Sequence, residues 1–252
     1  MSAEVFPHPT VQEVAFEIRY PHMFIIENKI GEFQEGIITE FPDSQLVLER
    51  QMVLTSTGPE GKLEKVPEQE PPVIRKLWVF KSEKGYEVRV ATNSLVIVSH
   101  HHKTYNNPNG DRFRDVISLV TSNLFRIIKI PVIKRVGLRY IDECPLPSKD
   151  NSTLAKFYNS TIPYERFPVN DVANSYFQIT TKRKNHNLTF REVLKKEGEK
   201  HKLILDFDGF EMQVPSVDLL PITDELHSII EEEYFGIVKA PLKEYMRTGL
   251  LE

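Results

Sequence analysis

The sequence predicts an α+β protein built on a curved, mostly antiparallel sheet with helices packed against it. Apolar and polar residues alternate with a period of two along much of the chain, and several such segments follow one another without a helix between them. Three other segments repeat apolar residues every three or four positions, which is the spacing of a helix with one buried side. A doubly wound parallel sheet would need a helix after nearly every strand, so that class is excluded.

The N-terminal part predicts a strand, a helix and then further strands. In residues 11–20 apolar residues alternate with charged ones, which predicts a half-buried strand. Apolar residues at helical spacing between Pro21 and Pro42 predict the first helix. Further strands are predicted at residues 45–55, 73–81 and 86–99, and the proline-rich segment 56–72 predicts a long loop.

The C-terminal part predicts a helix, several strands and a last helix. A helix is predicted at residues 111–130 and a strand at 132–141, followed by a polar region at 145–174. Strands are then predicted at residues 175–182, 188–194, 202–207 and 210–214, with Asp208-Gly209 as the turn of the last hairpin. The final helix, residues 223–246, is predicted to kink near Pro241 because proline lacks a backbone donor.

Length and composition limit the classes of protein. A chain of 252 residues fits one α+β unit, and the alternative is a division into residues 1–145 and 146–252. The net charge of −4 excludes a generally polycationic nucleic-acid binder but allows a local basic patch. The single Cys144 favours a reducing compartment, and we find no signal peptide and no apolar run of about 20 residues. These features predict a cytoplasmic protein that does not span a membrane.

Two of the predicted strands share a short internal echo. Residues 16–20 read Phe-Glu-Ile-Arg-Tyr, and residues 137–141 read Gly-Leu-Arg-Tyr-Ile. Strings of this kind arise readily in strands, so the echo alone is weak support for a duplication. The sequence therefore leaves open whether the sheet consists of two similar halves or closes like a barrel.

The same segments resemble a known family. Residues 9–19 read PxxxEVxFEIR and residues 135–141 read RVGLRYI, which are similar to the two signatures of a sporadically distributed prokaryotic family of about this length without an assigned function. The resemblance implies a bacterial or archaeal cytoplasmic protein whose patchy occurrence is typical of mobile or defence-related genes. It implies no catalytic residues. One departure is Asp142, where the family would place Asn.

Charged residues on the predicted strands suggest one enzymatic hypothesis. If the sheet closed with these residues inside, acids could hold Mg²⁺ or Mn²⁺ and arginines could hold phosphate oxygens, as in a triphosphate tunnel enzyme. The candidate metal ligands are Glu13, Glu17, Asp206 and Asp208. The candidate phosphate ligands are Arg19, Arg89, Arg135 and Arg139. The alternative is that all of them form the solvated face of an antiparallel sheet.

No residue is predicted to be catalytic. The sequence contains neither Gly-x-Ser-x-Gly nor Gly-x-Gly-x-x-Gly. The Asp206-Phe-Asp208 string resembles the nucleophile motif of phosphatases with a parallel core, but the short segment that follows it cannot build such a sheet. We interpret the two aspartates as residues of a turn that could still bind a metal ion.

Two basic segments and one aromatic edge suggest partners. The first basic segment, 126–139, contains Arg126, Lys129, Lys134, Arg135 and Arg139. The second basic segment, 182–202, contains Lys182, Arg183, Lys184, Arg191, Lys195, Lys196, Lys200 and Lys202. On one common face these segments would bind nucleic-acid phosphates. The final helix has an apolar stripe, of the kind that usually packs on its own sheet, formed by Leu226, Ile230, Ile237 and Leu242. Beside it, Tyr234 and Phe235 form an aromatic edge that could pair with a second copy of the chain.

Three functions are therefore open. The first is a binding or regulatory protein that acts through a protein partner or a small anionic ligand, with no role for a membrane. The second is a metal-dependent phosphohydrolase that acts on a nucleotide or triphosphate in a charged barrel. The third is a nucleic-acid-binding module. The direction in which the charged strand faces point distinguishes them, because solvated charges have no need to converge.

Overall fold

The computed structural model describes residues 4–50, 54–56, 63–65, 74–100, 105–106, 110–197 and 200–251. The strands of the main sheet are β1 (Val11–Arg19), β2 (Asp43–Arg50), β5 (Ile74–Lys81), β6 (Tyr86–Ala91), β7 (Ser94–Ser99), β8 (Val132–Leu146), β9 (Ser175–Arg183), β10 (His186–Glu197) and β11 (Lys200–Pro215). The helices are α1 (Ile25–Ile37), α2 (Phe113–Ile127), α3 (Asn151–Phe157), α4 (Leu219–Ile237) and α5 (Ala240–Thr248), and the 3₁₀ turns are η1 (Val169–Asp171) and η2 (Ser216–Asp218).

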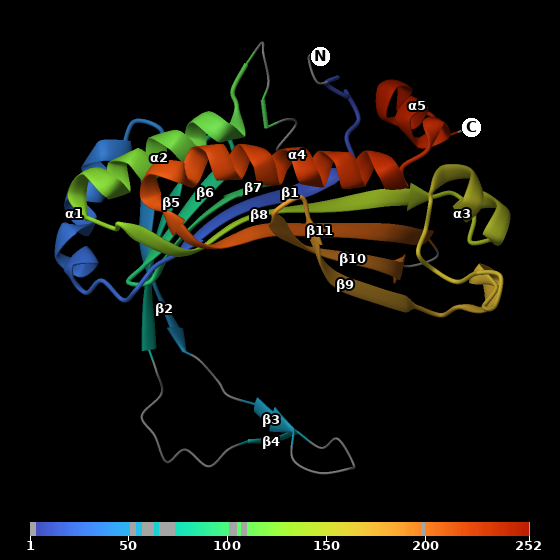
Figure 1. Ribbon diagram of the computed structural model, residues 1–252, viewed down its shortest axis with the longest axis horizontal. Coiled ribbons are helices and arrows are strands. Elements are labelled where there is room, and N and C mark those ends of the chain that lie inside the picture. The colour runs from blue at the N-terminus through green and yellow to red at the C-terminus, as the bar shows by residue number, and fades with distance from the viewer. Residues whose placement is uncertain are drawn as a thin grey trace.

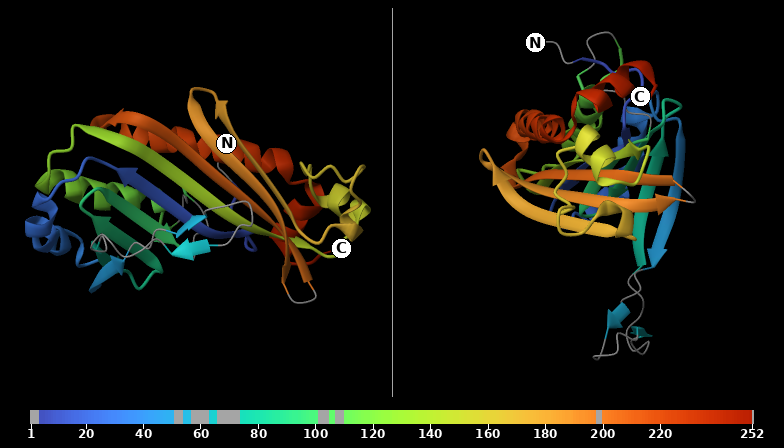
Figure 2. Two further views of the ribbon diagram at one scale, coloured as in Figure 1. Left: turned by 90° about the horizontal axis from the view of Figure 1, so that it is seen from below. Right: turned by 90° about the vertical axis from the view of Figure 1, so that its right-hand side faces the viewer.

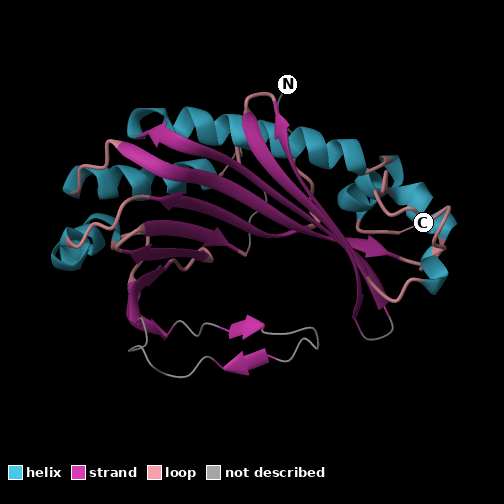
Figure 3. Ribbon diagram, turned by 60° about the horizontal axis from the view of Figure 1, so that its bottom comes forward, coloured by secondary structure: helices cyan, strands magenta, loops and turns pink. Residues whose placement is uncertain are grey.

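Nine strands form one antiparallel sheet in the order β2-β5-β6-β7-β1-β8-β11-β10-β9 (Figures 1 and 3). Helices α2 and α4 lie along one face of the sheet, and no helix of the described residues covers the opposite face. The two views of Figure 2 show how strongly the strands at the two ends are twisted relative to one another. The fold is α+β, as predicted. The sheet is open, with β2 and β9 at its edges, so the barrel-like alternative is wrong.

A second, two-stranded sheet pairs β3 (Leu54–Ser56) with β4 (Leu63–Lys65). Both strands belong to the stretch between β2 and β5 in which the long loop is predicted. The other residues of that loop, 57–62 and 66–72, lie outside the described residues. Of the helices in the described ranges, none has the length and apolar character needed to cross a membrane.

Alternation along β1 and β8 separates the two faces of the main sheet. Phe16, Ile18 and Leu138 point toward the helices and are completely buried. Glu17 and Arg139 lie between such residues in the sequence and point to the uncovered face. An antiparallel sheet with helices on one side buries that side and leaves polar residues on the other. The charged strand faces therefore point away from the core.

The chain contains the same arrangement twice. In the first copy, β1 is followed by α1, by a meander of strands that ends in β7, and by α2, and β7 pairs with β1. In the second copy, β8 is followed by α3, by a meander that ends in β11, and by α4, and β11 pairs with β8. The copies meet at the centre of the sheet, where β1 pairs with β8. The structure therefore has the two similar halves that the sequence left open.

The register between β1 and β8 explains the internal echo. Glu17 lies directly opposite Gly137. Arg19 lies two residues beyond Glu17, Arg139 lies two residues beyond Gly137, and a tyrosine follows each arginine. A two-fold axis through the Glu17–Gly137 pair therefore relates both the strands and their Arg-Tyr motifs.

One turn is missing from the prediction and one predicted turn is wrong. The predicted strand at residues 86–99 is a pair of strands, β6 and β7, joined at Thr92 and Asn93. In contrast, β11 runs straight through Asp208 and Gly209, where the sequence predicts a turn. Gly209 faces α4, and an added Cβ would lie 3.3 Å from Ile230. This glycine makes room for the helix and does not serve a turn.

The predicted final helix is broken into two. Helix α4 begins at Leu219 and ends at Ile237, and α5 begins at Ala240. Pro241 lies in the first turn of α5. Proline is tolerated there because the first N–H groups of a helix have no intrahelical acceptor. The helix therefore ends before Pro241 and a second helix begins there, whereas the sequence predicts one helix with a kink.

Helices α1 and α2 approach closely at a glycine. A Cβ on Gly36 of α1 would lie 2.0 Å from Oδ1 of Asn123 on α2. Nδ2 of Asn123 donates a buried hydrogen bond of 2.7 Å to the carbonyl oxygen of Phe33, also on α1. The missing side chain at position 36 thus allows the contact. Gly31, on the same helix, has no atom within 4 Å of its Cβ position.

This pair of glycines yields a test of the helix packing. We expect Gly36→Ala to lower the free energy of unfolding by about 1–3 kcal/mol, because the added methyl group pushes Asn123 out of place. We expect Gly31→Ala to raise it by about 0.5–1 kcal/mol, because alanine has the higher helix propensity and meets no atom there. Urea unfolding of both variants measures the difference, and equal effects would contradict the close α1–α2 contact.

Candidate functional site

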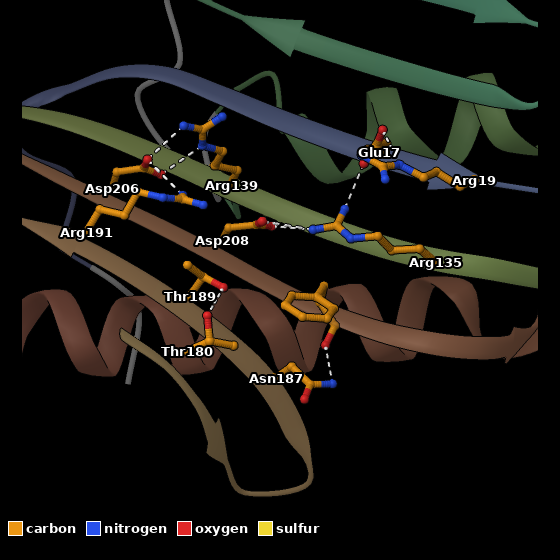
Figure 4. A network of polar contacts seen from close by, with 11 residues as sticks. Glu17, Arg19, Arg135, Arg139, Thr180, Asn187, Thr189, Arg191, Asp206 and Asp208 are labelled. Carbon is orange, nitrogen blue, oxygen red and sulfur yellow. Dashed lines mark hydrogen bonds and ion pairs between the residues drawn. The ribbon is translucent and has the colours of Figure 1, made fainter. Parts of the chain in front are cut away.

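Six of the eight residues predicted as metal or phosphate ligands come together on the uncovered face of the sheet (Figure 4). Three adjacent strands supply them, β1, β8 and β11, because every second residue of a strand points to the same face. The six are Glu17, Arg19, Arg135, Arg139, Asp206 and Asp208. Together with Arg191 of β10 they form a set of ion pairs that we name the charged face.

Arg135 lies at the centre of the charged face, between two carboxylates. Its Nη1 donates to Oε2 of Glu17 at 2.8 Å, and its Nη2 donates to the two oxygens of Asp208 at 2.7 and 2.9 Å. The guanidinium also lies over the ring of Phe210, 4.8 Å from its centroid. Gly137 makes this position available, since a Cβ there would come within 2.2 Å of Nη1.

Asp206 is the second centre of the charged face. Its carboxylate accepts hydrogen bonds from Nε and Nη2 of Arg139 at 2.8 and 2.7 Å and from Nη1 of Arg191 at 3.0 Å. The hydrogen bond to Asp206 raises the pKa of Arg139. Arg19 completes the set, because its Nε donates to Oε1 of Glu17 at 2.8 Å. Each carboxylate of the charged face therefore meets at least one guanidinium.

The other two predicted ligands lie apart from this set. Glu13 is on β1, and its carboxylate lies 3.4 Å from Nδ1 of His100. Arg89 is on β6, which β7 separates from β1, and its Nε contacts the carboxylate of Glu87. The structure therefore does not bring Arg89 to the other three predicted phosphate ligands.

The charged face has the geometry of a structural network. Its four arginines pair with its three acids, mostly across neighbouring strands, which stabilises the register of those strands. A metal ion or a phosphate would have to replace partners that these groups already have. Within the ranges that the structure describes, no group of three or more His, Cys, Asp or Glu residues is placed to hold a metal ion.

Acidic residues also accompany the two basic segments. Arg135 and Arg139 of the first basic segment belong to the charged face. In the second basic segment, Arg183 contacts Glu233 and Lys184 contacts Glu232, and both acids lie on α4. These acids are distant in the sequence, so a reading of the segments alone could not pair them.

A partly open pocket of about 120 Å³ lies on the helix-covered side of the sheet, and we name it the α4 pocket. Strand β8 contributes Tyr140 and Asp142, which alternate on its helix-facing side. Helix α4 contributes side chains three or four positions apart, which therefore share one side of the helix. The residues from α4 are His227, Ile230, Glu231, Tyr234 and Phe235. The N-terminal segment contributes Glu4, Phe6, Pro9 and Thr10, and α5 contributes Met246.

Two carboxyl groups of the α4 pocket have no basic partner. Asp142 is only 5% exposed, and among the described residues its one hydrogen-bond partner is Thr10, whose Oγ1 donates to Oδ1 at 2.8 Å. Burial raises the pKa of Asp142 to about 7. Burial also raises the pKa of Glu231, which forms no ion pair within the described ranges. By contrast, the buried Glu192 of β10 accepts hydrogen bonds from Ser160 and Thr161.

Aromatic rings form much of the remaining wall. His227 stacks on Tyr105 with ring centroids 4.2 Å apart, and its Nδ1 lies 3.2 Å from the hydroxyl of Tyr140. Burial lowers the pKa of His227 to about 4, so its imidazole is neutral at pH 7. The hydroxyl of Tyr105 donates to Asp224 at 2.9 Å, and Arg114 donates two further hydrogen bonds to the same carboxylate. The imidazole therefore adds no positive charge to the pocket.

Residues 4–10 and α5 close one side of the α4 pocket together. The backbone N–H of His8 donates to the carbonyl oxygen of Met246 at 3.0 Å. Arg247 donates to both carboxylate oxygens of Glu4 at 2.6 and 2.9 Å. These contacts attach the segment that precedes β1 to the last helix, and thereby hold Thr10 beside Asp142.

Reasoning from sequence missed the α4 pocket. One signal was present, because Asp142 interrupts the apolar residues on the helix-facing side of β8. A charged residue at such a buried position either has a partner of opposite charge or serves a function. The other lining residues come from segments that only the fold brings together.

The comparisons with known proteins give no further information about the site. No family model, no curated protein and no solved structure matches this chain. The family resemblance of residues 9–19 and 135–141 therefore stays a prediction.

The charged face predicts different effects for two arginine substitutions. We expect Arg135→Met to lower the free energy of unfolding by about 2–4 kcal/mol, because Asp208 and Glu17 lose a partly buried cation. Arg89→Met removes an arginine from a more exposed ion pair on β6, and we expect a change within about 1 kcal/mol. Urea unfolding at low and high salt measures both. A loss of similar size for the two variants would contradict a structural role for the charged face.

Proposed function

We propose that this protein is a ligand-binding protein whose α4 pocket takes a small organic cation. The observation that carries the proposal is the pair of carboxyl groups, Asp142 and Glu231, that have no basic partner in the described part of the chain. On the charged face, acids of this sheet are paired with arginines. Asp142 is buried and Glu231 is partly buried, and carboxyl groups without a cation are costly in such positions, so a bound cation would compensate them.

The walls of the pocket support the same ligand class. Aromatic rings favour cations over their faces, and Tyr105 and Tyr234 line the pocket beside the two carboxyl groups. The ring of Phe235 already has a cation, since Nζ of Lys243 lies 4.9 Å from its centroid. None of the described lining residues is Lys or Arg. This composition favours a cation over the small anionic ligand that the sequence suggests.

The volume of the pocket limits the size of the ligand. A cavity of about 150 Å³ holds benzene in an engineered protein, so about 120 Å³ suits a group such as trimethylammonium. Because the pocket is partly open, the rest of a longer molecule can extend into solvent. We therefore propose a quaternary or primary ammonium group attached to a polar chain, for which choline is a suitable probe.

The pKa of Asp142 couples binding to pH. Its carboxyl group is mostly protonated at pH 6 and mostly ionised at pH 8, because burial raises its pKa to about 7. A cation binds the ionised form more tightly, so affinity increases with pH across this range. Tyr140, Tyr234 and Cys144, which lie beside it, have pKa values raised by burial and stay neutral at pH 8. His227 of the same pocket is also neutral, since burial lowers its pKa to about 4.

Two other hypotheses from the sequence have less support. A nucleic-acid-binding module would need arginines that are free to bind phosphate. A phosphohydrolase would also need carboxylates that are free to bind a metal ion. On the charged face these groups pair with one another instead. We retain a cytoplasmic location as part of the proposal, supported by the buried thiol of Cys144.

Titration calorimetry with choline tests the proposal. We expect a Kd between about 10 μM and 1 mM at pH 8, as is usual for a small ligand, and about tenfold weaker binding at pH 6. The neutral isostere 3,3-dimethylbutan-1-ol has the same shape and should not bind measurably. Equal binding of the alcohol and choline, or no binding of choline, would contradict the proposal.

Three variants locate the binding in the α4 pocket. Asp142→Asn keeps the shape of the protonated carboxyl group, and we expect it to weaken choline binding at pH 8 and remove the pH dependence. Glu231→Gln should weaken binding at pH 8, because it removes the second carboxyl group of the pocket. Glu232→Gln is the matched control, since it makes the same charge change on the adjacent, exposed residue of α4. Loss of binding in the control would place the ligand elsewhere.

A further inference from the structure

The edge strand β9 has a free side in the described structure. It pairs with β10 along its whole length, and no described strand pairs with its other side. Most of its residues are exposed, among them the apolar Tyr176 and Ile179 at 64% and 46%. A long edge with exposed apolar side chains is a surface on which another strand can add.

The internal repeat indicates what is missing there. Counted outward from the centre, the first half has the strands β1, β7, β6, β5 and β2, whereas the second half has β8, β11, β10 and β9. Strand β9 thus corresponds to β5, and β5 is covered on its outer side by β2. Among its described residues, the second half has no strand in the position of β2. The antiparallel partner that protects β5 is therefore absent beside β9.

The hairpin between β9 and β10 fixes which groups point outward. Arg183 and His186 form the pair that closes a two-residue turn, so their backbone groups bond to each other. From Arg183 backward, every second residue of β9 directs its backbone N–H and C=O to β10. Ile179 is one of these residues. The N–H and C=O groups of the residues on either side, Gln178 and Thr180, point to the free edge.

We propose that β9 is the interface of a homodimer, in which the β9 strands of two copies pair antiparallel about a two-fold axis at Ile179. The axis places Ile179 opposite Ile179 of the second copy and covers both exposed side chains. Tyr176 then lies opposite Lys182, where ring and ammonium attract each other. Arg183 lies opposite Ser175, so no two like charges face each other across the interface. The pairing joins two nine-stranded sheets into one.

The alternative dimer surface, the aromatic edge of the final helix, packs within the chain. Tyr234 and Phe235 are partly buried against the core, and the neighbouring apolar stripe is buried on its own sheet, as Leu226, Ile230 and Leu242 show. The dimer proposal therefore rests on β9 alone. It does not depend on the α4 pocket.

Sedimentation analysis of matched variants tests the interface. We expect the unaltered chain to reach twice its mass of 29.2 kDa as its concentration rises. Ile179→Lys places two like charges together at the axis and should keep the protein monomeric. The control is Leu46→Lys on β2, which adds the same charge to an exposed apolar residue of the other edge strand. A monomeric unaltered chain, or a dimer that Leu46→Lys abolishes and Ile179→Lys does not, would overturn the proposal.

A symmetric cross-link provides a second measurement that does not depend on a destabilising charge. In antiparallel strands, two residues that lie opposite each other without sharing backbone hydrogen bonds have Cα atoms about 4.5 Å apart. This distance is within the range of a disulfide. Ile179→Cys should therefore form a disulfide-linked dimer under mild oxidation, visible on a non-reducing gel. The native Cys144 is buried and leaves the unaltered chain without cross-links. Cross-linking at Leu46→Cys and not at Ile179→Cys would contradict the interface.

Discussion

The antiparallel pairing of β1 with β8 is the interaction on which the rest of the structure depends. It joins the two halves of the chain into one sheet, with Glu17 opposite Gly137 at the axis between them. The same register directs Phe16 toward the helices. It also directs Arg139 to the uncovered face. A shift by one residue would exchange these faces, so the core and the charged face specify the register together.

This register also explains why acids on the two faces differ. On the charged face, the carboxylates of Glu17 and Asp208 form ion pairs with Arg135 of β8. On the helix-covered face, Asp142 lies opposite the start of β1 and meets only the hydroxyl of Thr10 among the described residues. A cationic ligand can pair with a carboxyl group that has no cation within the protein.

The sequence predicts the class of the fold because alternation and helical spacing are local properties. It fails where a residue acts through a distant neighbour: Gly209 makes room for Ile230, although its local pattern is that of a turn. The candidate residues Asp206 and Asp208 are on one face, as alternation requires, but their arginine partners depend on strand order. The α4 pocket needs the contact between β8, α4 and the N-terminal segment, which no local pattern contains.

The most direct test of the proposed function is the number of protons released when choline binds. Calorimetry at pH 6.5 in buffers of different ionisation enthalpy measures this number. We expect release of most of one proton from the unaltered protein, because a cation lowers a carboxyl pKa that burial holds at about 7. We expect no release from Asp142→Asn. Binding without proton release would show that Asp142 does not contact the ligand and would contradict the proposed site.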